Sequence, residues 1–245
     1  MLRIDGDTRL LVLTGAGVSA ESGVPTFRDA NGLWENHPVE KVATPDGFEE
    51  DPRLVWRFYS ERRRQAKTVC PNPGHTVLVE AEGRMGDRFL LVTQNVDGLH
   101  RRAGSVRLVE IHGSLFETRC SGCHREPFPD DREYLGDPPR CEECTARGRR
   151  GLLRPAVVWF GELLDPMLLD RISAFVKEPR AGRLVFLAVG TSGLVYPAAG
   201  MVLQARAAGA EAWLVNAEPP DNVRAFHHFV QGRSGEVLPG LFEWA

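Results

Sequence analysis

The sequence predicts an α/β protein built around a parallel sheet. One observation is a set of apolar runs of strand length, most of them followed by a glycine-rich or polar turn, at residues 10–13, 89–93, 106–109, 184–189 and 212–215. A second is a helical pattern at 198–208 between the last two runs, which predicts a βαβ unit and hence parallel strands. A third is a segment with two cysteine pairs, which predicts a separate metal-binding module.

The composition favours one large domain or one domain with an insertion. The chain has 245 residues, 42% of them hydrophobic, and a formal net charge of −3, which gives no sign of a nucleic-acid-binding surface. No apolar run approaches the roughly eighteen residues of a membrane span, and the N-terminal residues do not resemble a secretory signal. Five cysteines, an odd number, fit a reducing compartment. We therefore expect a cytoplasmic protein that binds neither membranes nor nucleic acid directly; its oligomeric state is left open, with a monomer as one option.

A glycine-rich turn follows the first apolar run. Gly15, Gly17 and Ala20 match G-x-G-x-x-G/A, the arrangement that brings backbone N–H groups and a helix N-terminus to a pyrophosphate. Glycines also occur in tight turns for steric reasons alone. A dehydrogenase would end a second strand in an acidic residue about twenty residues later, whereas residues 31–38 predict no strand. A dinucleotide bound here would therefore have its ribose held by other residues.

This turn and the residues after it resemble the opening signature of the sirtuins, the NAD-dependent protein deacylases. The resemblance rests on residues 15–19 and 22–28. It implies that Ala16, Phe27 and Arg28 lie on a loop that closes over NAD, with glycines that let the loop move. The NAD-binding residues that it implies in this part of the chain are Gly15, Ala16, Gly17, Ser19, Ala20, Gly23, Pro25, Thr26, Phe27, Arg28 and Trp34.

A helix is predicted from about Pro52, after a segment that we expect to be irregular because it contains Gly32, Pro38, Pro45 and Gly47. Its apolar stripe has helical spacing and consists of Val55, Phe58, Tyr59, Ala66 and Val69. Arg62 falls within this stripe, whereas Arg63 and Arg64 fall off it. Pro71 and Pro73 end the helix, another helix begins near His75, and Cys70 is expected to be a buried thiol.

Polar loops follow the strands at 89–93 and 106–110. Ligands of open α/β sheets bind beyond the carboxyl ends of the strands, although each loop by itself is as well explained as a plain polar turn. Gln94, Asn95, Val96 and Asp97 resemble the sirtuin motif for the NAD ribose and nicotinamide, and His112 resembles the catalytic histidine of that family. The resemblance thus implies a catalytic set of His112, Asn95 and Asp97, with 94–97 also binding NAD.

Four cysteines predict a structural zinc site. Cys120 and Cys123 are separated by seventeen residues from Cys141 and Cys144, a spacing typical of two knuckles that share one tetrahedral ion. Two redox pairs or two disulfides are the rival interpretations, but the sequence offers neither a βαβ nor a secretory context for them. A site with four thiolate ligands is closed and therefore structural rather than catalytic.

The C-terminal third contains further segments that resemble sirtuin motifs. Residues 154–162 resemble the strand and loop that pair with the substrate backbone, with Ala156 where the family often has histidine. The substrate-binding residues implied there are Val158, Phe160, Gly161 and Glu162. The turns after the strands at 184–189 and 212–215 and the segment before Leu238 imply further NAD contacts, at Gly190, Thr191, Ser192, Asn216, Ala217, Glu218 and Ser234.

The resemblance covers nearly the whole chain. It implies a Rossmann-like large domain (1–35, 76–118 and 152–245) and a smaller inserted domain made of a helical module (36–75) and a zinc-binding module (119–151). It implies a lysine deacylase that acts on acylated proteins, with NAD as cosubstrate and one structural zinc ion. The acyl oxygen attacks C1′ of the nicotinamide ribose, nicotinamide leaves, and His112 takes a proton from a ribose hydroxyl. The products are lysine, nicotinamide and O-acyl-ADP-ribose.

Tyr59 and Arg62 bear on which acyl group is removed. They lie three residues apart on one helix face. From the pattern alone, an Arg62 side chain that reaches solvent over Tyr59 is slightly favoured. However, Tyr-x-x-Arg followed by Pro-Asn-Pro-Gly-His at 71–75 resembles the sirtuin class that removes succinyl and malonyl groups. A guanidinium can bind a terminal carboxylate through two parallel hydrogen bonds, and a phenol can add a third.

Two alternative functions stay open at this point. One is a protein ADP-ribosyltransferase that uses the same NAD site but passes ADP-ribose to a protein. The other is a non-enzymatic, NAD-responsive binding module whose zinc ribbon docks a partner.

Overall fold

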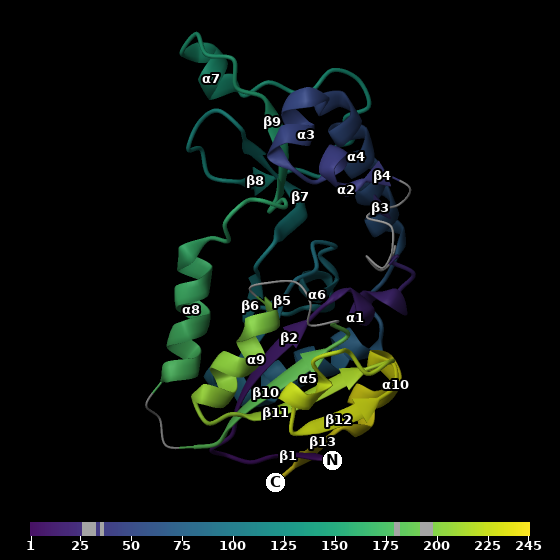
Figure 1. Ribbon diagram of the computed structural model, residues 1–245, viewed down its shortest axis with the longest axis vertical. Helices are drawn as coiled ribbons and strands as arrows, with labels where there is room; N and C mark the ends of the chain where they lie inside the picture. The colour runs from purple at the N-terminus through teal and green to yellow at the C-terminus, as the bar shows by residue number, and fades with distance from the viewer. Residues whose placement is uncertain (26–32, 35–36, 179–181, 192–197) are drawn as a thin grey trace.

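A six-stranded parallel sheet forms the centre of the larger part of the molecule (Figure 1). The computed structural model describes residues 1–25, 33–34, 37–178, 182–191 and 198–245, and the statements below concern these residues. The strand order is β12-β11-β10-β2-β5-β6, and all neighbours are parallel. The strands are β2 (Arg9–Thr14), β5 (Phe89–Thr93), β6 (Leu108–Glu110), β10 (Leu184–Val189), β11 (Glu211–Asn216) and β12 (His228–Gln231).

The order of the strands places a topological switch between β2 and β10. From β2 the chain builds outward through β5 and β6, and on the other side it builds outward from β10 through β11 and β12. Ligands of open α/β sheets bind where the strand order reverses, beyond the carboxyl ends of the strands. The loops after β2, β5, β10 and β11 therefore meet where a ligand is expected.

Helices cover both faces of the sheet, which explains why β2, β5 and β10 are buried along their whole lengths. On one face, α8 and α9 pack against side chains such as Leu11 and Phe186. On the other face, α5 packs against side chains such as Leu10 and Leu187. The predicted α/β fold with a parallel sheet is confirmed. The helices in this part of the chain are α1 (Ala16–Ala20), α5 (Pro73–Met85), α6 (Leu99–Ala103), α8 (Pro166–Lys177), α9 (Ala198–Ala207) and α10 (Ser234–Val237), with short 3₁₀ helices η1 (Gly86–Arg88), η2 (Val223–Ala225) and η3 (Leu238–Gly240).

Several strands were not predicted, and one begins later than expected. The strand that was predicted from residue 106 is β6, which starts at Leu108. Val106 is 82% exposed and lies outside the sheet. β1 (Leu2–Ile4) and β13 (Phe242–Trp244) form a parallel pair that brings the two ends of the chain together (Figure 1). Residues 31–38 contain β3 (Leu33–Trp34) and β4 (His37–Pro38), a two-residue antiparallel pairing outside the large sheet, so the prediction of no strand there was wrong.

The smaller part of the molecule lies at the end opposite β1 and β13 (Figure 1). It joins a three-stranded antiparallel sheet of order β8-β7-β9 to the helices that precede it in the chain. These elements share a third apolar core, which includes Trp56, Phe58 and Leu153. They are α2 (Val39–Val42), α3 (Pro45–Glu50), α4 (Pro52–Thr68), β7 (Gly113–Cys120), β8 (Phe128–Pro129), α7 (Glu142–Ala146) and β9 (Leu153–Val157).

Helix α4 begins where the sequence predicts but buries more of its surface than the predicted stripe. The Asp51 side chain accepts a hydrogen bond from the Leu54 amide, and Pro52 occupies the first turn. The helix ends at Thr68, so Val69 lies outside it in extended backbone. The irregular segment expected before α4 contains α2 and α3, and this prediction was also wrong.

Arg63 and Cys70 correct two further predictions. Arg63 was placed off the buried stripe, but its side chain is fully buried and donates to the carbonyl oxygens of Leu115, Glu117 and Arg132, at 2.5, 3.0 and 2.7 Å. Cys70 was expected to be buried and is exposed. Among the described residues, no helix combines the length and the apolar composition that a membrane span requires.

Candidate active site and metal centre

The glycine-rich turn after β2 packs directly on the turn after β10. The Gly15 amide donates to the Val189 carbonyl at 3.0 Å, and the Gly17 amide donates to the Gly190 carbonyl at 2.8 Å. A Cβ atom on Gly17 would lie 2.7 Å from Gly190 Cα, and one on Gly190, whose φ is +60°, would lie 2.4 Å from the Val18 nitrogen. Glycine is therefore required at these positions, because the backbones of the turns after β2 and β10 are in direct contact at the switch point.

Asn95 is held against this turn by its side chain. Its Nδ2 donates to the Gly15 carbonyl at 3.0 Å and to Ser19 Oγ at 3.1 Å, and its side chain is almost fully buried. Asp97 accepts a hydrogen bond from the Leu99 amide at 2.8 Å. Burial raises the pKa of Asp97, while the Leu99 amide and the Ser19 hydroxyl act in the opposite direction. The structure thus brings together the predicted residues Ser19, Asn95 and Asp97.

His112 presents one ring nitrogen for proton transfer. Its Nδ1 lies 3.0 Å from the Gln94 carbonyl oxygen, which can only accept, so Nδ1 carries the proton and Nε2 keeps its lone pair. Burial lowers the pKa of His112, and the Gln94 carbonyl partly offsets this. The His112 carbonyl also accepts the Val158 amide at 2.9 Å. A half-buried, neutral imidazole whose Nε2 has no hydrogen-bond partner among the described residues is suited to act as a general base.

The loops after β5, β10 and β11 are connected by Thr191. Gln94 Nε2 donates to Thr191 Oγ1 at 3.0 Å, and Asn216 Nδ2 lies 3.4 Å from the Thr191 carbonyl and 2.9 Å from the Glu218 carbonyl. Thr191 and Asn216 are buried, whereas Ala217 and Glu218 are exposed. Three predicted NAD-binding segments therefore meet at one edge of the sheet.

Ser234 joins the same region from the C-terminal segment. Its hydroxyl donates to Glu21 Oε2 at 2.8 Å, and the Gly235 amide donates to the same oxygen at 2.7 Å. Asn72 Nδ2 donates to the Val18 carbonyl at 2.7 Å and to Ser22 Oγ at 3.0 Å. Sequence reasoning assigned no organising role to Glu21, a single polar residue, or to Asn72, which lies inside the Pro-Asn-Pro-Gly-His stretch, because neither position reveals its distant partners.

Some predicted site residues can be placed only in part. Val96 is half-buried beside Asn95, and its carbonyl accepts the Leu115 amide at 2.9 Å. Of the predicted NAD-binding residues in and after α1, Ala16 is half-buried, and Ala20, Gly23 and Pro25 are exposed. Predicted residues that lie outside the described residues are Thr26, Phe27, Arg28, Ser192 and the side chain of Trp34.

The loop after β9, which we expect to pair with substrate, is held by an ion pair between Arg154 in β9 and Glu162 in the loop. Arg154 binds both Glu162 oxygens, at 2.6 and 3.0 Å, and its guanidinium lies 3.3 Å from the centre of the Trp159 ring. Burial would raise the pKa of Glu162, but the hydrogen bonds from Arg154 and the Trp159 amide lower it overall. The Glu162 carboxylate thus organises the loop.

The outer end of this loop is open to solvent. Phe160 is 50% exposed, and its amide donates to the Ala43 carbonyl at 2.9 Å. Gly161 has a φ of +87°, a conformation that favours glycine. Val158 is half-buried next to His112. The loop therefore presents backbone and an aromatic side chain beside the histidine.

Tyr59 and Arg62 lie on α4 and make different contacts. Tyr59 is fully buried, its oxygen accepts the Trp159 indole N–H at 2.9 Å, and burial raises its pKa. The Arg62 guanidinium lies 4.9 Å from the centre of the Phe58 ring, and its side chain is 14% exposed. The Arg62 side chain therefore packs over Phe58 and is mostly enclosed.

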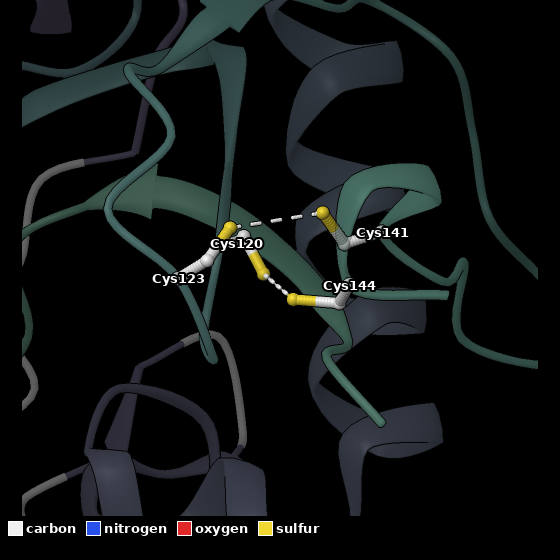
Figure 2. Close-up of side chains that lie close together, drawn as sticks. All are labelled: Cys120, Cys123, Cys141 and Cys144. Atoms are coloured by element: carbon white, nitrogen blue, oxygen red, sulfur yellow. Dashed lines mark hydrogen bonds between the residues drawn. The ribbon is translucent and has the colours of Figure 1, made fainter. Parts of the chain in front are cut away.

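The four cysteines form one cluster, as Figure 2 shows. Their Sγ atoms all lie within 4.8 Å of one another, with Cys120 and Cys144 at 3.7 Å and Cys123 and Cys141 at 3.8 Å. These separations are far longer than a disulfide bond and match the edge of about 3.8 Å of a tetrahedron with zinc–sulfur bonds of about 2.3 Å. A Cβ on Gly151 would lie 2.5 Å from Cys144 Sγ, so a glycine is needed beside the cluster. The cluster is able to hold one structural zinc ion.

Comparisons with known proteins agree with this geometry. A model of the Sir2 family matches residues 15–197. An NAD-dependent protein deacylase of Pasteurella multocida (strain Pm70) is 45% identical over 94% of this chain and 95% of that protein. NAD-dependent protein deacylase 2 of Pyrobaculum aerophilum is 47% identical over 95% of this chain and 89% of its own length.

Solved structures are similar over nearly the whole chain. A complex of a Sir2 homologue with NAD matches with a TM-score of 0.81 and 38% identity, over 94% of this chain and 86% of that one. A Sir2 protein bound to acetylated peptide matches with a TM-score of 0.78 and 26% identity, over 94% of this chain and 90% of that one.

Proposed function

The chain belongs to the Sir2 family and is an NAD-dependent protein deacylase, and we propose that it removes succinyl and malonyl groups from protein lysines in addition to acetyl groups. Its relatives include a Sir2 protein bound to an acetylated peptide, which supports acylated-lysine peptides as substrates. The observation that carries the finer proposal is that Arg62 lies three residues after Tyr59 on α4, and that Tyr59 bonds to Trp159 in the loop after β9.

The residues at the switch point fit NAD as cosubstrate. Ser19, Asn95 and Asp97 supply a hydroxyl, an amide and a carboxylate in hydrogen-bonding contact, which is the chemistry that binds ribose hydroxyls and a carboxamide. Thr191 and Asn216 extend this polar surface along the sheet edge. NAD supplies an electrophilic ribose carbon and nicotinamide as leaving group. We assign Asn95 and Asp97 to the nicotinamide ribose and the residues around Asn216 to the adenosine ribose.

We assign His112 as the general base. The Gln94 carbonyl fixes the proton on Nδ1, so Nε2 is the atom that accepts a proton from a ribose hydroxyl. The His112 carbonyl holds Val158 at the start of the loop that we assign to the peptide backbone. The base and the bound peptide are therefore positioned by the same short stretch of backbone.

The contacts of Tyr59 and Arg62 support acidic acyl groups. Arg62 is mostly enclosed and packed against an aromatic ring, so its guanidinium would meet a carboxylate in a weakly solvated environment, where a bidentate pair is strongest. Tyr59 lies three residues before Arg62 on the same helix, and its oxygen accepts a hydrogen bond from the Trp159 indole, which fixes the phenol beside the loop after β9. Acetyl-lysine has no carboxylate and gains nothing from either group.

The test compares succinyl-, malonyl- and acetyl-lysine forms of one peptide. For Arg62→Met we expect kcat/KM with the succinyl peptide to fall by an amount equivalent to about 2–5 kcal/mol of transition-state stabilisation. We expect a much smaller fall in kcat/KM with the acetyl peptide. Arg57→Met is the matched control, because Arg57 is an exposed arginine on the same helix. Equal losses with both peptides would show that Arg62 is structural and would end the acidic-acyl proposal.

Mass spectrometry of the products separates deacylation from ADP-ribosyl transfer. Deacylation yields O-acyl-ADP-ribose and an unmodified lysine, whereas transfer yields a protein heavier by one ADP-ribosyl group. Release of nicotinamide without a deacylated peptide would favour the transferase.

A further inference from the structure

The side chain of Asn72 caps the N-terminus of α5. Asn72 lies in the connection between α4 and α5, and it is buried. Its Oδ1 accepts the Gly74 amide at 2.9 Å, in the first turn of the helix. A cap of this kind needs only an oxygen, and serine or aspartate supplies one as well as asparagine does. The cap therefore does not explain what the amide nitrogen of Asn72 does.

The amide nitrogen of Asn72 caps a second helix, α1, at its C-terminal end. Nδ2 donates to the Val18 carbonyl at 2.7 Å and to Ser22 Oγ at 3.0 Å. In a continued helix the Val18 carbonyl would accept the Ser22 amide, but that amide donates to the Ser19 carbonyl at 3.0 Å. Asn72 therefore supplies a donor to a carbonyl that the end of the helix leaves open.

The partners of Asn72 fix the orientation of its amide group. The Gly74 amide can only donate and the Val18 carbonyl can only accept, so the oxygen faces α5 and the nitrogen faces α1. A rotated amide group would set two acceptors against each other at Val18 and two donors at Gly74. One side chain thus bonds the start of α5 through its oxygen and the end of α1 through its nitrogen.

Helix α1 carries groups that hold the candidate NAD site. Ser19 directly follows Val18, and its Oγ accepts Asn95 Nδ2 at 3.1 Å. The Gly15 carbonyl, just before α1, accepts the same Asn95 nitrogen at 3.0 Å. A shift of α1 would therefore move the groups that fix the side chain of Asn95.

The connection that carries Asn72 is held independently of α1. The Arg102 guanidinium, on α6, donates to the Ala66 carbonyl in the last turns of α4 and to the Val69 carbonyl after it, both at 2.7 Å. An arginine that bonds the last carbonyls of a helix is a favourable C-terminal contact. Asn72 can therefore position α1 from a segment whose own place is already fixed.

We propose that Asn72 is a positioning residue for NAD, which holds α1 and thereby Ser19 and Asn95 in the arrangement that the cosubstrate binds. This role rests on the proposed function, in which Ser19 and Asn95 belong to the NAD site. The effect reaches NAD through α1, since Asn72 bonds to Val18 and Ser22. Loss of the link is therefore expected to weaken NAD binding without removing a catalytic group.

Two substitutions separate the cap of α5 from the link to α1. Asn72→Ser keeps an oxygen for the Gly74 amide but lacks the amide N–H groups, whereas Asn72→Ala removes both functions. We expect the dissociation constant of NAD, measured by calorimetry without peptide, to rise about tenfold in both variants through the lost hydrogen bonds. We expect the melting temperature to fall further in Asn72→Ala, because only this variant loses the cap. An unchanged dissociation constant in Asn72→Ser would show that Asn72 only caps α5.

Asp165→Ala is the matched control for the loss of a helix cap. The Asp165 side chain caps α8 by accepting the Met167 amide at 2.8 Å, and it is exposed. We expect this variant to have a lower melting temperature and an unchanged dissociation constant for NAD. Equal weakening of NAD binding in Asp165→Ala and Asn72→Ser would show that a general loss of stability explains the effect, and would overturn the positioning role.

Amide hydrogen exchange tests the link in the absence of NAD. The Gly23 and Val24 amides donate to the Ala20 and Ser19 carbonyls at 3.0 and 3.2 Å, in the turn that follows α1. We expect both amides to exchange faster in Asn72→Ser than in the wild type, while the amides of β2 keep their exchange rates. Unchanged exchange at both positions would contradict the proposal that Asn72 holds α1.

These measurements fail separately from the proposed function. If the wild type lacks deacylase activity but the Asn72→Ser variant binds NAD about tenfold more weakly, the proposed function is contradicted and the positioning role stands. If the wild type is an active deacylase and Asn72→Ser binds NAD equally well, the positioning role alone is overturned. If Asn72→Ser does not fold, Asn72→Asp decides by the same measurement, because aspartate also keeps the cap oxygen and has no N–H group.

Discussion

The Trp159 indole N–H donates to the Tyr59 phenol oxygen across 2.9 Å, although the two residues are 100 positions apart in the chain. The bond joins α4 to the loop after β9. Trp159 is itself fixed from behind by Arg154, whose guanidinium stacks on its ring. The residue that we assign to acyl recognition and the loop that we assign to peptide binding are therefore held as one unit.

We expect Trp159→Phe to lower the preference for succinyl over acetyl peptide. Phenylalanine keeps an aromatic face for Arg154 but removes the hydrogen bond that orients Tyr59, a loss of about 0.5–1.5 kcal/mol. The measurement is the ratio of kcat/KM values for the two peptides in Trp159→Phe, Tyr59→Phe and the double variant. Additive effects of the two substitutions would mean that the bond does not contribute to specificity.

We expect His112→Ala to lower deacylation by about 10²–10⁴-fold while leaving the fold intact, because it removes a proton acceptor at the edge of the site. In the wild type, activity should rise with pH as His112 loses its proton, and burial places this rise below the ordinary histidine pKa of 6.5. The measurement is a profile of kcat/KM against pH. An activity limb above 6.5, or near wild-type turnover in His112→Ala, would contradict the assignment.

We expect metal analysis to find one zinc ion per chain. Cys141→Ser should lose most of the zinc and lower the melting temperature, since the segment between the cysteine pairs has little core of its own. Activity should fall only as this part of the molecule unfolds. Cys70→Ser is the matched control, because Cys70 is exposed and outside the cluster. A zinc-free Cys141→Ser protein with wild-type stability and activity would contradict the structural role.

We expect Arg63→Met to destabilise the protein by about 3–5 kcal/mol. The substitution removes the hydrogen bonds to the carbonyl oxygens of Leu115, Glu117 and Arg132. It also removes the fully buried one of the two arginines that pair with the Asp130 carboxylate, which keeps its ion pair with Arg132. Arg64→Met, at the next position but on the exposed side, should change stability little. Denaturant unfolding of the two variants checks this, and equal midpoints would show that Arg63 is dispensable.

The strands of the large sheet could be predicted because their whole length is buried. Continuous apolar runs such as Leu184–Val189 occur where both faces of a parallel sheet are covered. β12 has no such pattern, because it lies at the sheet edge and its residues are half-buried or exposed. β1 and β13 are three residues each, too short for any periodicity.

Arg63 shows why helix periodicity can mislead. The predicted stripe describes one buried face of α4, but a second buried face is formed by Trp56 and Arg63, which bond to β9 and β7, and by Ser60, which bonds to Tyr134. An arginine is tolerated there because backbone carbonyls accept its protons. The sequence does not reveal which carbonyl groups of distant segments lie near Arg63, so the burial of Arg63 could not be inferred from it.

The candidate site was predictable as a set of segments rather than as a set of contacts. The motifs around Gly15, Asn95 and His112 could be recognised because each is continuous in the chain. The groups that hold these motifs, such as Thr14, Glu21 and Asn72, are single polar residues from other elements. Their roles depend on which elements pack together, and only the fold supplies that information.

The pairing of β1 with β13 sets an order of events during synthesis. The Leu2 amide bonds to the Leu241 carbonyl, and the Ala245 amide bonds to the Ile4 carbonyl, so β1 is held by a segment that is synthesised much later than β1 itself. β2, by contrast, has its partner β5 as soon as Thr93 has emerged. The side chains of Leu2 and Ile4, which are buried in the folded protein, therefore lack their β13 partner until that strand has emerged. The first strand that the structure describes is thus paired by the last one that it describes.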